Sequence, residues 1–510
     1  MALKSKEFYR ELFSRSDWNL DTLRYADELC EHYAREWLKL DIYPNHIEVV
    51  TSEQLIDAMS LIGLPISYPH WSFGKQFAMS ESGYKQGYQN LSYEMIINSN
   101  PCISYNVETN TTCLMVLVIA HAAMGHNAFF KNNYMFKEWT QADAIVEYMK
   151  FARDYVMDCE DKYGYEEVET FLDACHALQY YGVDRYKKPK KMSPDKAKKR
   201  FKEALEFERK DYNPLWDTLP ERSLKKRLAK SVRDIEKFPK HPEENILYFL
   251  QKNTPELPTW KRELIRIVRK TAQYFYPQGL TKVINEGTAT FAHYHLVHKL
   301  YEDGYLPDGF MQEFFKHHSN VIYQPTYKHK GYYGLNPYTL GFNIFQDIKR
   351  MCENPTEEDK LWFPDLVGKD WIEQFNYIYQ NFRDDSFVLQ YLSPKVIREM
   401  GLFTINDDDN ERKLSVDSIH NERGYRRVRE SLSQMYNRDY YLPNLQVYDV
   451  DVKGDRCLTL AHYPYNRREL DRGSARDTLE YVRHIWGYRT KLVSIGPEGG
   501  REMLFDLIQH

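Results

Sequence analysis

The fold depends first on one stretch of sequence, Thr112-Cys-Leu-Met-Val-Leu-Val-Ile-Ala-His-Ala-Ala-Met-Gly-His-Asn-Ala-Phe-Phe-Lys-Asn-Asn133. It contains the longest apolar run of the chain, residues 113–123, and its pattern predicts a helix over about 112–130. The run is shorter than the roughly 18 apolar residues that a membrane span requires, and His121 interrupts it. We therefore expect a buried core helix and no membrane span.

Two histidines and three asparagines lie in or beside this apolar helix, and burying them is costly unless they bind something. Imidazole is a common ligand of transition metals. His121 and His126 are five residues apart, about 140° around a regular α-helix, so they would not face one ion. A single-turn π-bulge, with a repeat of about five residues, would align them. The general base of the HExxH zinc motif is absent, because Ala122 stands in its place.

A second segment, Val283-Ile-Asn-Glu-Gly-Thr-Ala-Thr-Phe-Ala-His-Tyr294, carries further candidates. Its Asn-Glu-Gly-x-Ala start resembles the third-ligand helix of gluzincin aminopeptidases, in which the Glu binds zinc. Glu286 and His293 share one helix face but lie about 10 Å apart along the axis. We predict that His121, His126 and Glu286 bind a divalent metal such as zinc, with His293 in the outer shell or touching substrate. Hydrogen-bonded core histidines are the alternative.

Tyrosine is concentrated in the turn Tyr332-Tyr-Gly-Leu-Asn-Pro-Tyr338, which enters a helix. In zincin-like helical peptidases a tyrosine of such a segment stabilises an oxyanion, so Tyr338 joins His293 as a candidate catalytic residue. A packed turn is the alternative. The pair Asp173 and His176 offers a different metal pattern, seen in di-iron helix bundles. Only one such motif is visible, so an ordinary buried polar pair is the preferred interpretation.

The composition of the chain argues against some classes of protein. The chain has 510 residues, of which 42% are hydrophobic and 28% charged, and a net charge of -5, so a general grip on nucleic acid is not indicated. The basic stretch 187–202 reads as a solvated linker, with an RNA-contacting arm as the alternative. Seven scattered cysteines without a CxxC pair and an N-terminus without a signal peptide indicate a cytoplasmic protein.

The order of predicted elements indicates two domains. Residues 1–400 read as a mainly α domain with a zincin-like helical core, a basic linker or helical insertion at 187–240, and a small β-hairpin at 93–98 and 102–107. The first 50 or so residues read as helix. Residues 401–510 follow the order βαββαβ, with a strand at 413–416, a helix at 420–435, strands at 445–452 and 458–463, a helix at 475–485 and a strand at 491–495. This order predicts a C-terminal α+β module of ferredoxin-like fold.

Several long motifs resemble the SpoVR family. They are Tyr68-Pro-His-Trp-Ser-Phe-Gly-Lys75, the histidine segment 121–133, the segments 175–178 and 181–186, the Asn-Glu-Gly segment 285–294, and the segments 336–342, 346–350 and 355–360. The resemblance covers nearly the whole chain. It implies an association with spore cortex formation in spore-formers and with stress responses in other bacteria. It also implies gene neighbours as partners, namely a PrkA-type serine protein kinase and a YeaH/YhbH-type protein.

The resemblance implies no particular reaction, so the chemistry rests on the residues alone. Our preferred hypothesis is metal-assisted hydrolysis of an amide, in which a second carboxylate or His293 replaces the missing base. The alternative is a non-enzymatic adaptor or regulator in a pathway linked to the PrkA-type kinase, with the C-terminal module as its docking domain.

Overall fold

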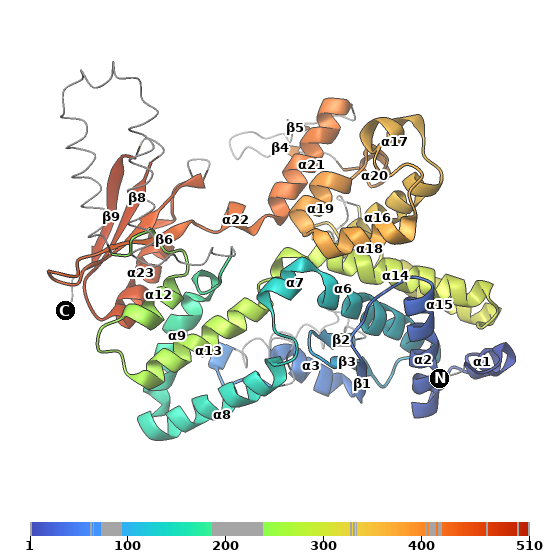
Figure 1. Ribbon diagram of the computed structural model, residues 1–510, viewed down its shortest axis with the longest axis horizontal. Coiled ribbons are helices and arrows are strands. Elements are labelled where there is room, and N and C mark those ends of the chain that lie inside the picture. Colours follow the sequence, from blue (N-terminus) through green and yellow to red (C-terminus); the bar gives the residue numbers. More distant parts are fainter. Residues whose placement is uncertain are drawn as a thin grey trace, which may run out of the picture. The chain divides into compact units, whose positions relative to one another are not determined.

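A computed structural model describes residues 3–61, 66–72, 94–185, 238–326, 334–402, 421–465, 468–496 and 499–507, with Leu64, His329, Tyr332, 405–406 and 415–416. The chain divides into two compact units (Figure 1): unit 1 is Met1–Glu169 with Tyr274–Leu442, and unit 2 is Thr170–Gln273 with Pro443–His510. This division differs from the predicted boundary at 400, because unit 1 extends to Leu442 and unit 2 includes Thr170–Gln273 as well as the C-terminal residues. The predicted basic linker falls almost wholly outside the described residues.

Unit 1 is mainly helical. Its first part comprises α1 (Lys6–Leu12), α2 (Leu20–Glu36), β1 (Asn45–Val50), α3 (Ser52–Ser60), β2 (Glu94–Ile97), β3 (Cys102–Val107), α5 (Thr112–Val118), the π-helix η1 (Ile119–His126), α6 (Asn127–Asn132), α7 (Tyr134–Trp139) and α8 (Ile145–Tyr163). Its second part comprises α14 (Lys282–Glu302), α15 (Asp308–Val321), α16 (Pro337–Glu353), α17 (Glu357–Trp362), α18 (Trp371–Asn381), α19 (Asp384–Tyr391), α20 (Pro394–Glu399), β4 (Ile405–Asn406), β5 (Ser415–Val416), α21 (Glu422–Tyr436) and α22 (Arg438–Tyr441).

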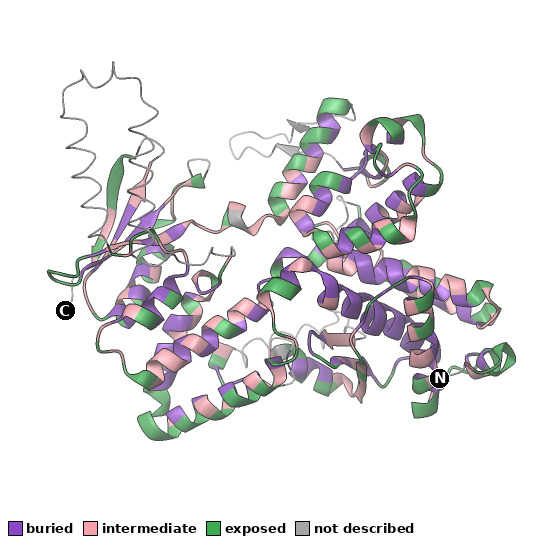
Figure 2. Ribbon diagram, in the orientation of Figure 1, coloured by how far each residue is buried: buried purple, intermediate pink, exposed green. Residues whose placement is uncertain are grey.

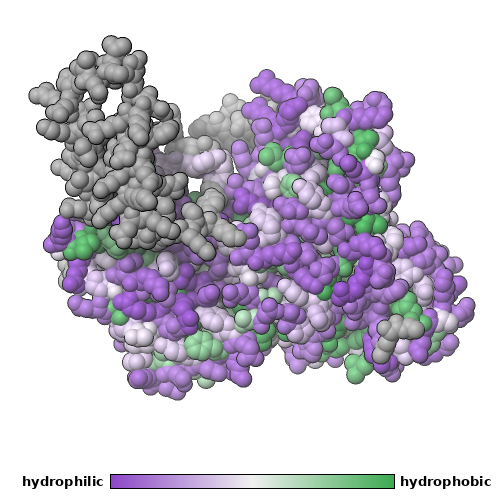
Figure 3. Space-filling view, viewed as in Figure 1, coloured by the Kyte–Doolittle hydropathy of each residue, from purple (hydrophilic) through white to green (hydrophobic). Residues whose placement is uncertain are grey.

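The predicted core helix is confirmed as the continuous run α5–η1–α6. All residues from 112 to 130 are buried, as the colouring of this run in Figure 2 illustrates. Within the described ranges, Thr112–Asn132 is the one helical stretch long and apolar enough to cross a membrane, and its apolar window is fully buried in the protein. The described part of the face in Figure 3 is mostly hydrophilic, with scattered hydrophobic residues. This long apolar helix is therefore a core element and gives no clear membrane span.

Helix α14 packs against both η1 and α16 at points where backbones nearly touch. A Cβ on Gly125 of η1 would lie 2.5 Å from Ala289 Cα, and one on Gly287 would lie 2.6 Å from Gly341 Cα. Such spacing excludes any side chain at these glycines. The small residues of the Asn-Glu-Gly-x-Ala motif thus allow α14 to lie close between η1 and α16, and this brings the polar residues of the three elements together.

A three-stranded sheet lies beside this core, in the order β1-β3-β2. The predicted hairpin is confirmed, since β2 pairs with β3 in antiparallel fashion. Strand β1 pairs with β3 in parallel and was not predicted, because residues 1–50 read as helix. Its sequence, Asn45-His-Ile-Glu-Val-Val50, is rich in β-branched residues, a strand signal that the preceding helical periodicity obscured.

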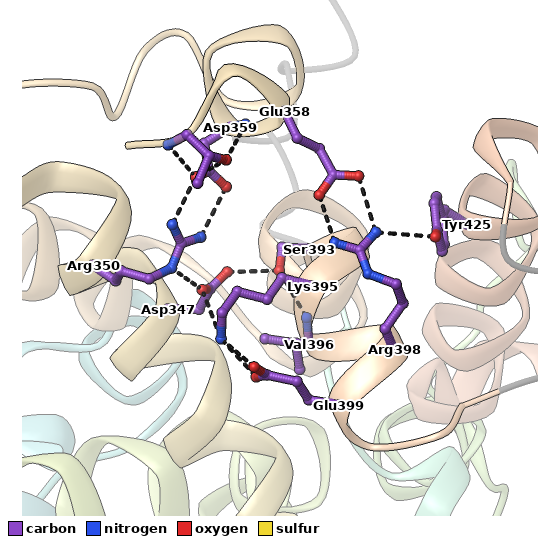
Figure 4. A network of polar contacts seen from close by, with 11 residues as sticks. Asp347, Arg350, Glu358, Asp359, Ser393, Lys395, Val396, Arg398, Glu399 and Tyr425 are labelled. Carbon is purple, nitrogen blue, oxygen red and sulfur yellow. Dashed lines mark hydrogen bonds and ion pairs between the residues drawn. The ribbon is translucent and has the colours of Figure 1, made fainter. Parts of the chain in front are cut away.

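A buried ionic network ties α16, α17 and α20 together (Figure 4). Arg350 of α16 donates to Asp347 at 2.7 Å and makes two bonds to Asp359 of α17, at 2.7 and 2.8 Å. Asp347 also accepts a bond of 2.6 Å from Ser393, the residue that caps α20. Both carboxylates are buried, and a buried charge is retained only when it is paired in this way. These residues account for much of the motifs at 346–350 and 355–360 as structural links.

Unit 2 contains most of α9 (Tyr165–Ala177), with η2 (Gln179–Tyr181), α12 (Ile246–Asn253), most of α13 (Thr259–Phe275), β6 (Leu445–Val450), β7 (Leu458–His462), α23 (Arg472–Trp486), β8 (Thr490–Ile495) and β9 (Arg501–Leu507). Its sheet has the order β6-β7-β8-β9, and α23 forms the crossover between the parallel strands β7 and β8.

The ferredoxin-like arrangement predicted for the C-terminal module is not observed. The helix expected at about 420–435 is α21, which belongs to unit 1 and packs against α19. The strand expected at 413–416 is β5, which pairs with β4 in a separate two-stranded sheet. Strand β9, which was not predicted, completes the four-stranded sheet instead. The order of elements along the chain does not determine which sheet each strand joins, and this is why the prediction failed.

Candidate metal centre

The two histidines of the core helix face one another because the helix is π-helical where they lie. η1 spans Ile119–His126, and the rings of His121 and His126 have centroids 4.7 Å apart. A five-residue separation closes about one turn of π-helix, whereas it would place the two side chains well apart around an α-helix. The π-helical turn that the spacing requires, if both histidines are to face one ion, is therefore present.

Two glutamates approach the histidines from other elements. Glu94 is the first residue of β2, and Glu286 lies in the second turn of α14. The start of α14 is held by the buried Asp384, whose carboxylate accepts bonds from the backbone N–H of Val283 at 3.0 Å and of Ile284 at 2.8 Å. This carboxylate satisfies two of the free N–H groups of the first turn. It thereby fixes the start of α14 and, with it, the position of Glu286.

The distances among these groups suit a shared ion better than hydrogen bonds. His121 Nε2 lies 3.3 Å from Glu94 Oε1 and 3.8 Å from Glu286 Oε2, and His126 Nε2 lies 3.4 Å from Glu286 Oε2. Hydrogen bonds between nitrogen and oxygen are about 2.7–3.2 Å long. In a tetrahedral zinc site with bonds of about 2.0–2.1 Å, the ligand atoms lie about 3.3–3.4 Å apart.

The burial of these four side chains also favours a bound cation. The side chains of His121 and His126 are 4% and 7% exposed, and those of Glu94 and Glu286 are 18% and 16% exposed. Each glutamate has a buried Oε2 atom without a hydrogen-bond partner among the described residues. Leaving a buried carboxylate oxygen unsatisfied is costly, and a cation beside the two histidines would satisfy such an oxygen. The ligand atoms of Glu94, His121 and His126 lie within 4.8 Å of one another.

The second ring nitrogen, Nδ1, of each imidazole lies within hydrogen-bond distance of a neighbouring side chain. His126 Nδ1 donates to Asn285 Oδ1 at 2.9 Å, which leaves the lone pair of Nε2 directed at the glutamates. His121 Nδ1 lies 2.9 Å from His293 Nδ1. Metal-binding histidines use their second nitrogen in this way, because the outer hydrogen bond fixes the ring and the tautomer. The Nε2 atom of His126 is thus available as a ligand atom, whereas that of His121 depends on which ring of the His121–His293 pair donates.

The pKa values of the two glutamates are shifted in opposite directions. Burial disfavours the charge on Glu286, but His126 and His121 outweigh it and hold its pKa below the ordinary value. Burial likewise opposes protonation of His126, yet the charges of Glu286 and Glu94 prevail and raise its pKa. Burial dominates at Glu94 and raises its pKa. Glu286 therefore has the character of an anionic ligand, whereas Glu94 accepts a proton more readily.

Comparison with known proteins places the chain in a family. Residues 17–441 match the family model described as SpoVR like protein. The chain belongs to the SpoVR family. Residues 443–497 match the SpoVR-like C-terminal domain, so the two models meet next to the boundary at Leu442 of unit 1. A relative from Escherichia coli (strain K12), "Uncharacterized protein YcgB", is 50% identical over 488 residues, covering 96% of this chain and 94% of its own. No solved structure matches the chain.

Four of the five residues predicted from the sequence meet at this candidate centre. His121, His126 and Glu286 surround one point, and the ring of Tyr338 stacks on that of His121 with centroids 6.0 Å apart. His293 lies behind His121, and both of its ring nitrogens are within hydrogen-bond distance of other histidines. It is therefore an outer residue, and its position does not allow it to act as a base towards the centre.

Two residues of the centre were not foreseen. Glu94 opens a strand whose sequence showed only a β pattern, and His318 lies on α15, which showed only helical periodicity. Neither belongs to a motif with known ligand spacing, and only the tertiary fold brings them to the site. The alternative pair Asp173 and His176 belongs to unit 2, whereas every residue of the centre belongs to unit 1.

Proposed function

We propose that this SpoVR-family chain is a metal-dependent hydrolase whose divalent ion is bound by His121, His126 and Glu286. One observation carries the proposal: buried nitrogen and carboxylate atoms from η1 and α14 converge with a carboxylate of β2 at 3.3–3.8 Å, a spacing that suits a common ion. Two imidazoles and one carboxylate form the ligand set of many hydrolytic zinc sites, which keep a further position open. A zincin-like core remains part of this proposal.

A divalent ion in such a position polarises a carbonyl oxygen and lowers the pKa of bound water. Glu94 is the candidate general base, because the glutamate that serves as base in HExxH sites is replaced here by Ala122. The raised pKa of Glu94 favours proton uptake. Its Oε2 atom accepts no hydrogen bond within the described part of the chain. It would take the proton of the attacking water and return it to the leaving nitrogen of an amide.

Tyr338 has the second role. The negative charge of Glu286, followed by burial, raises its pKa well above the ordinary value, so its hydroxyl stays protonated. A protonated phenol beside the centre can donate to the oxyanion that forms when water adds to an amide carbonyl. Tyr338→Phe should therefore lower kcat while leaving the bound metal in place.

The test compares two conservative variants of the full chain. Glu286→Gln should lose the metal, measured by elemental analysis after zinc loading and desalting. Glu94→Gln should keep about one equivalent and lose turnover of a panel of peptides and N-acyl amides by about 100-fold or more. If Glu94→Gln loses zinc as Glu286→Gln does, Glu94 is a ligand and the proposed base is wrong. If the zinc-loaded wild type cleaves no amide that the two variants leave intact, the hydrolase proposal is wrong.

The adaptor alternative makes the opposite prediction in cells. A regulator linked to a PrkA-type kinase would keep its function when the centre is altered, so His126→Ala should leave the phenotype of the gene intact. A hydrolase requires that His126→Ala behave like a deletion of the whole gene while the protein remains at its normal level.

A further inference from the structure

Behind His121 a row of three histidines extends away from the centre. His121 Nδ1 lies 2.9 Å from His293 Nδ1, and His293 Nε2 lies 2.8 Å from His318 Nδ1. The three rings come from η1, α14 and α15. All are buried, with His293 fully enclosed. Both contacts have ordinary hydrogen-bond lengths, and both join one imidazole nitrogen to another.

Counting hydrogens restricts how this row can be arranged. A neutral imidazole carries one N–H and one lone pair, so each contact needs the hydrogen of one ring and the lone pair of the next. His293 and His318 are both buried, and burial disfavours a charged imidazolium, so the row is built from neutral rings. Two arrangements remain, in which all N–H groups point either towards the metal centre or away from it.

The two arrangements differ at the ligand atom of His121. In the inward arrangement His318 Nδ1–H donates to His293, His293 Nδ1–H donates to His121, and the hydrogen of His121 lies on Nε2. In the outward arrangement His121 Nδ1–H donates to His293, His293 Nε2–H donates to His318, and Nε2 of His121 holds a lone pair. Without an ion, the inward arrangement directs the Nε2 hydrogen of His121 at the carboxylate of Glu94, whose Oε1 lies 3.3 Å away. Only the outward arrangement offers a ligand atom to an ion.

We propose, on the basis of the metal centre proposed above, that His293 and His318 are positioning residues that set the tautomer of His121, so that metal binding reverses the hydrogen bonds of the row as far as His318. The protons balance. The hydrogen on His121 Nε2 leaves as the ion binds, one hydrogen moves from His318 to His293 and another from His293 to His121, and His318 Nε2 takes one from solvent. Each ring carries one hydrogen in both arrangements.

The second ligand of the centre supplies an internal contrast. His126 Nδ1 faces Asn285 Oδ1, and a carbonyl oxygen can only accept. The tautomer of His126 is therefore preset with a free Nε2, whereas that of His121 depends on a partner that can either donate or accept. The row thus gives the SpoVR-family centre one fixed and one switchable imidazole.

The affinity of the full-length protein for Zn²⁺ alone, measured by competition with a chromophoric chelator, tests the proposal. His318→Phe keeps the ring shape but removes the acceptor, and should weaken zinc binding about 10- to 100-fold. His318→Asn restores an amide near the position of Nδ1 and should recover most of the affinity. His298→Phe is the matched control: His298 packs near the same Phe314 ring but is not part of the row, and zinc binding should be unchanged.

A second readout separates tautomer control from packing. In protein labelled with ¹⁵N-histidine, Nε2 of His318 should change from pyridine-like to pyrrole-like when zinc is added, and nitrogen signals assigned to His298 should not change. If wild type binds zinc stoichiometrically but His318→Phe binds it equally well, or the nitrogens of His318 do not respond, this proposal is wrong and the metal centre stands. If wild type binds no zinc, both proposals are wrong.

Discussion

At the scale of single residues, the centre depends on side chains that orient the proposed ligands without binding the ion themselves. Asn285 precedes the proposed ligand Glu286 on α14 and accepts the Nδ1 hydrogen of His126. One residue thus orients the imidazole and the next supplies the carboxylate that lies 3.4 Å from it. This explains in physical terms why an asparagine stands before the glutamate in the Asn-Glu-Gly motif.

Removing the acceptor at Asn285 should weaken the centre without removing a ligand. Asn285→Ala leaves the Nδ1–H of His126 without its partner and frees the ring, so zinc affinity should fall about 10- to 100-fold. Asn285→Asp keeps an acceptor oxygen and should bind zinc nearly as well as wild type. Competition titration of both variants measures the difference, and equal affinity of Asn285→Ala and wild type would contradict the role given to this residue.

Some residues of the candidate site could be predicted from the sequence and others could not. The five-residue spacing of His121 and His126 predicted the π-helix, because a regular helix would have left two buried imidazoles facing different surroundings. Glu286 and Tyr338 followed from motifs that resemble those of helical peptidases. Glu94 could not be predicted, since nothing local to a strand glutamate shows which helix its side chain will meet.

At the scale of elements, close contact between helices sets the geometry. Gly287 and Gly341 allow α14 and α16 to approach until their backbones meet, and Gly125 does the same for η1. Glu286, Tyr338 and His126 are each adjacent or close in sequence to one of these glycines. Any widening of the contacts would separate the proposed ligands, so packing and the proposed function depend on the same positions.

Adding one methyl group at this contact should destabilise the protein. Gly287→Ala places a Cβ 2.6 Å from Gly341 Cα, and backbone cannot move aside as a side chain can. Overpacking of this kind costs about 1–3 kcal/mol, so the melting temperature should fall by several degrees. The control is Gly309→Ala in α15, where a Cβ meets nothing within 4 Å and the better helix former should be neutral or slightly stabilising. A melting temperature of Gly287→Ala equal to that of wild type would show that the contact is loose.

The start of α14 gives a prediction about pH. Burial raises the pKa of Asp384 to about 7, against the backbone N–H groups of Ile284 and Val283 that favour its charge. The unfolded chain has the ordinary pKa of about 4, so the folded state binds more protons between the two values. The contribution of Asp384 to stability is therefore fully present below about pH 4 and is lost as pH rises through about 7.

Asp384→Asn removes this titration while keeping a side-chain oxygen. The difference in free energy of unfolding between wild type and Asp384→Asn should shift against the wild type as pH rises from about 4 to 7. Unfolding midpoints of both proteins across this range measure the difference. A difference that does not vary with pH would mean that the pKa of Asp384 is not raised by burial.

At the scale of the whole molecule, alternation and periodicity predicted most helices and most C-terminal strands but not their assembly. The helix α21 and the strand β5 were recognised as elements and assigned to the wrong unit, because local sequence does not record long-range partners. The boundary near 442 became visible only through contacts, and the family models meet at the same place. The cytoplasmic location, the spore or stress role and the kinase-linked partners remain predictions from composition and resemblance.

The most direct test of the metal centre is a crystal of the zinc-loaded full-length chain measured on both sides of the zinc absorption edge. We expect an anomalous peak about 2.0–2.2 Å from His121 Nε2, His126 Nε2 and a carboxylate oxygen of Glu286. A zinc-loaded crystal in which those three side chains are ordered and no anomalous peak lies between them would contradict the centre.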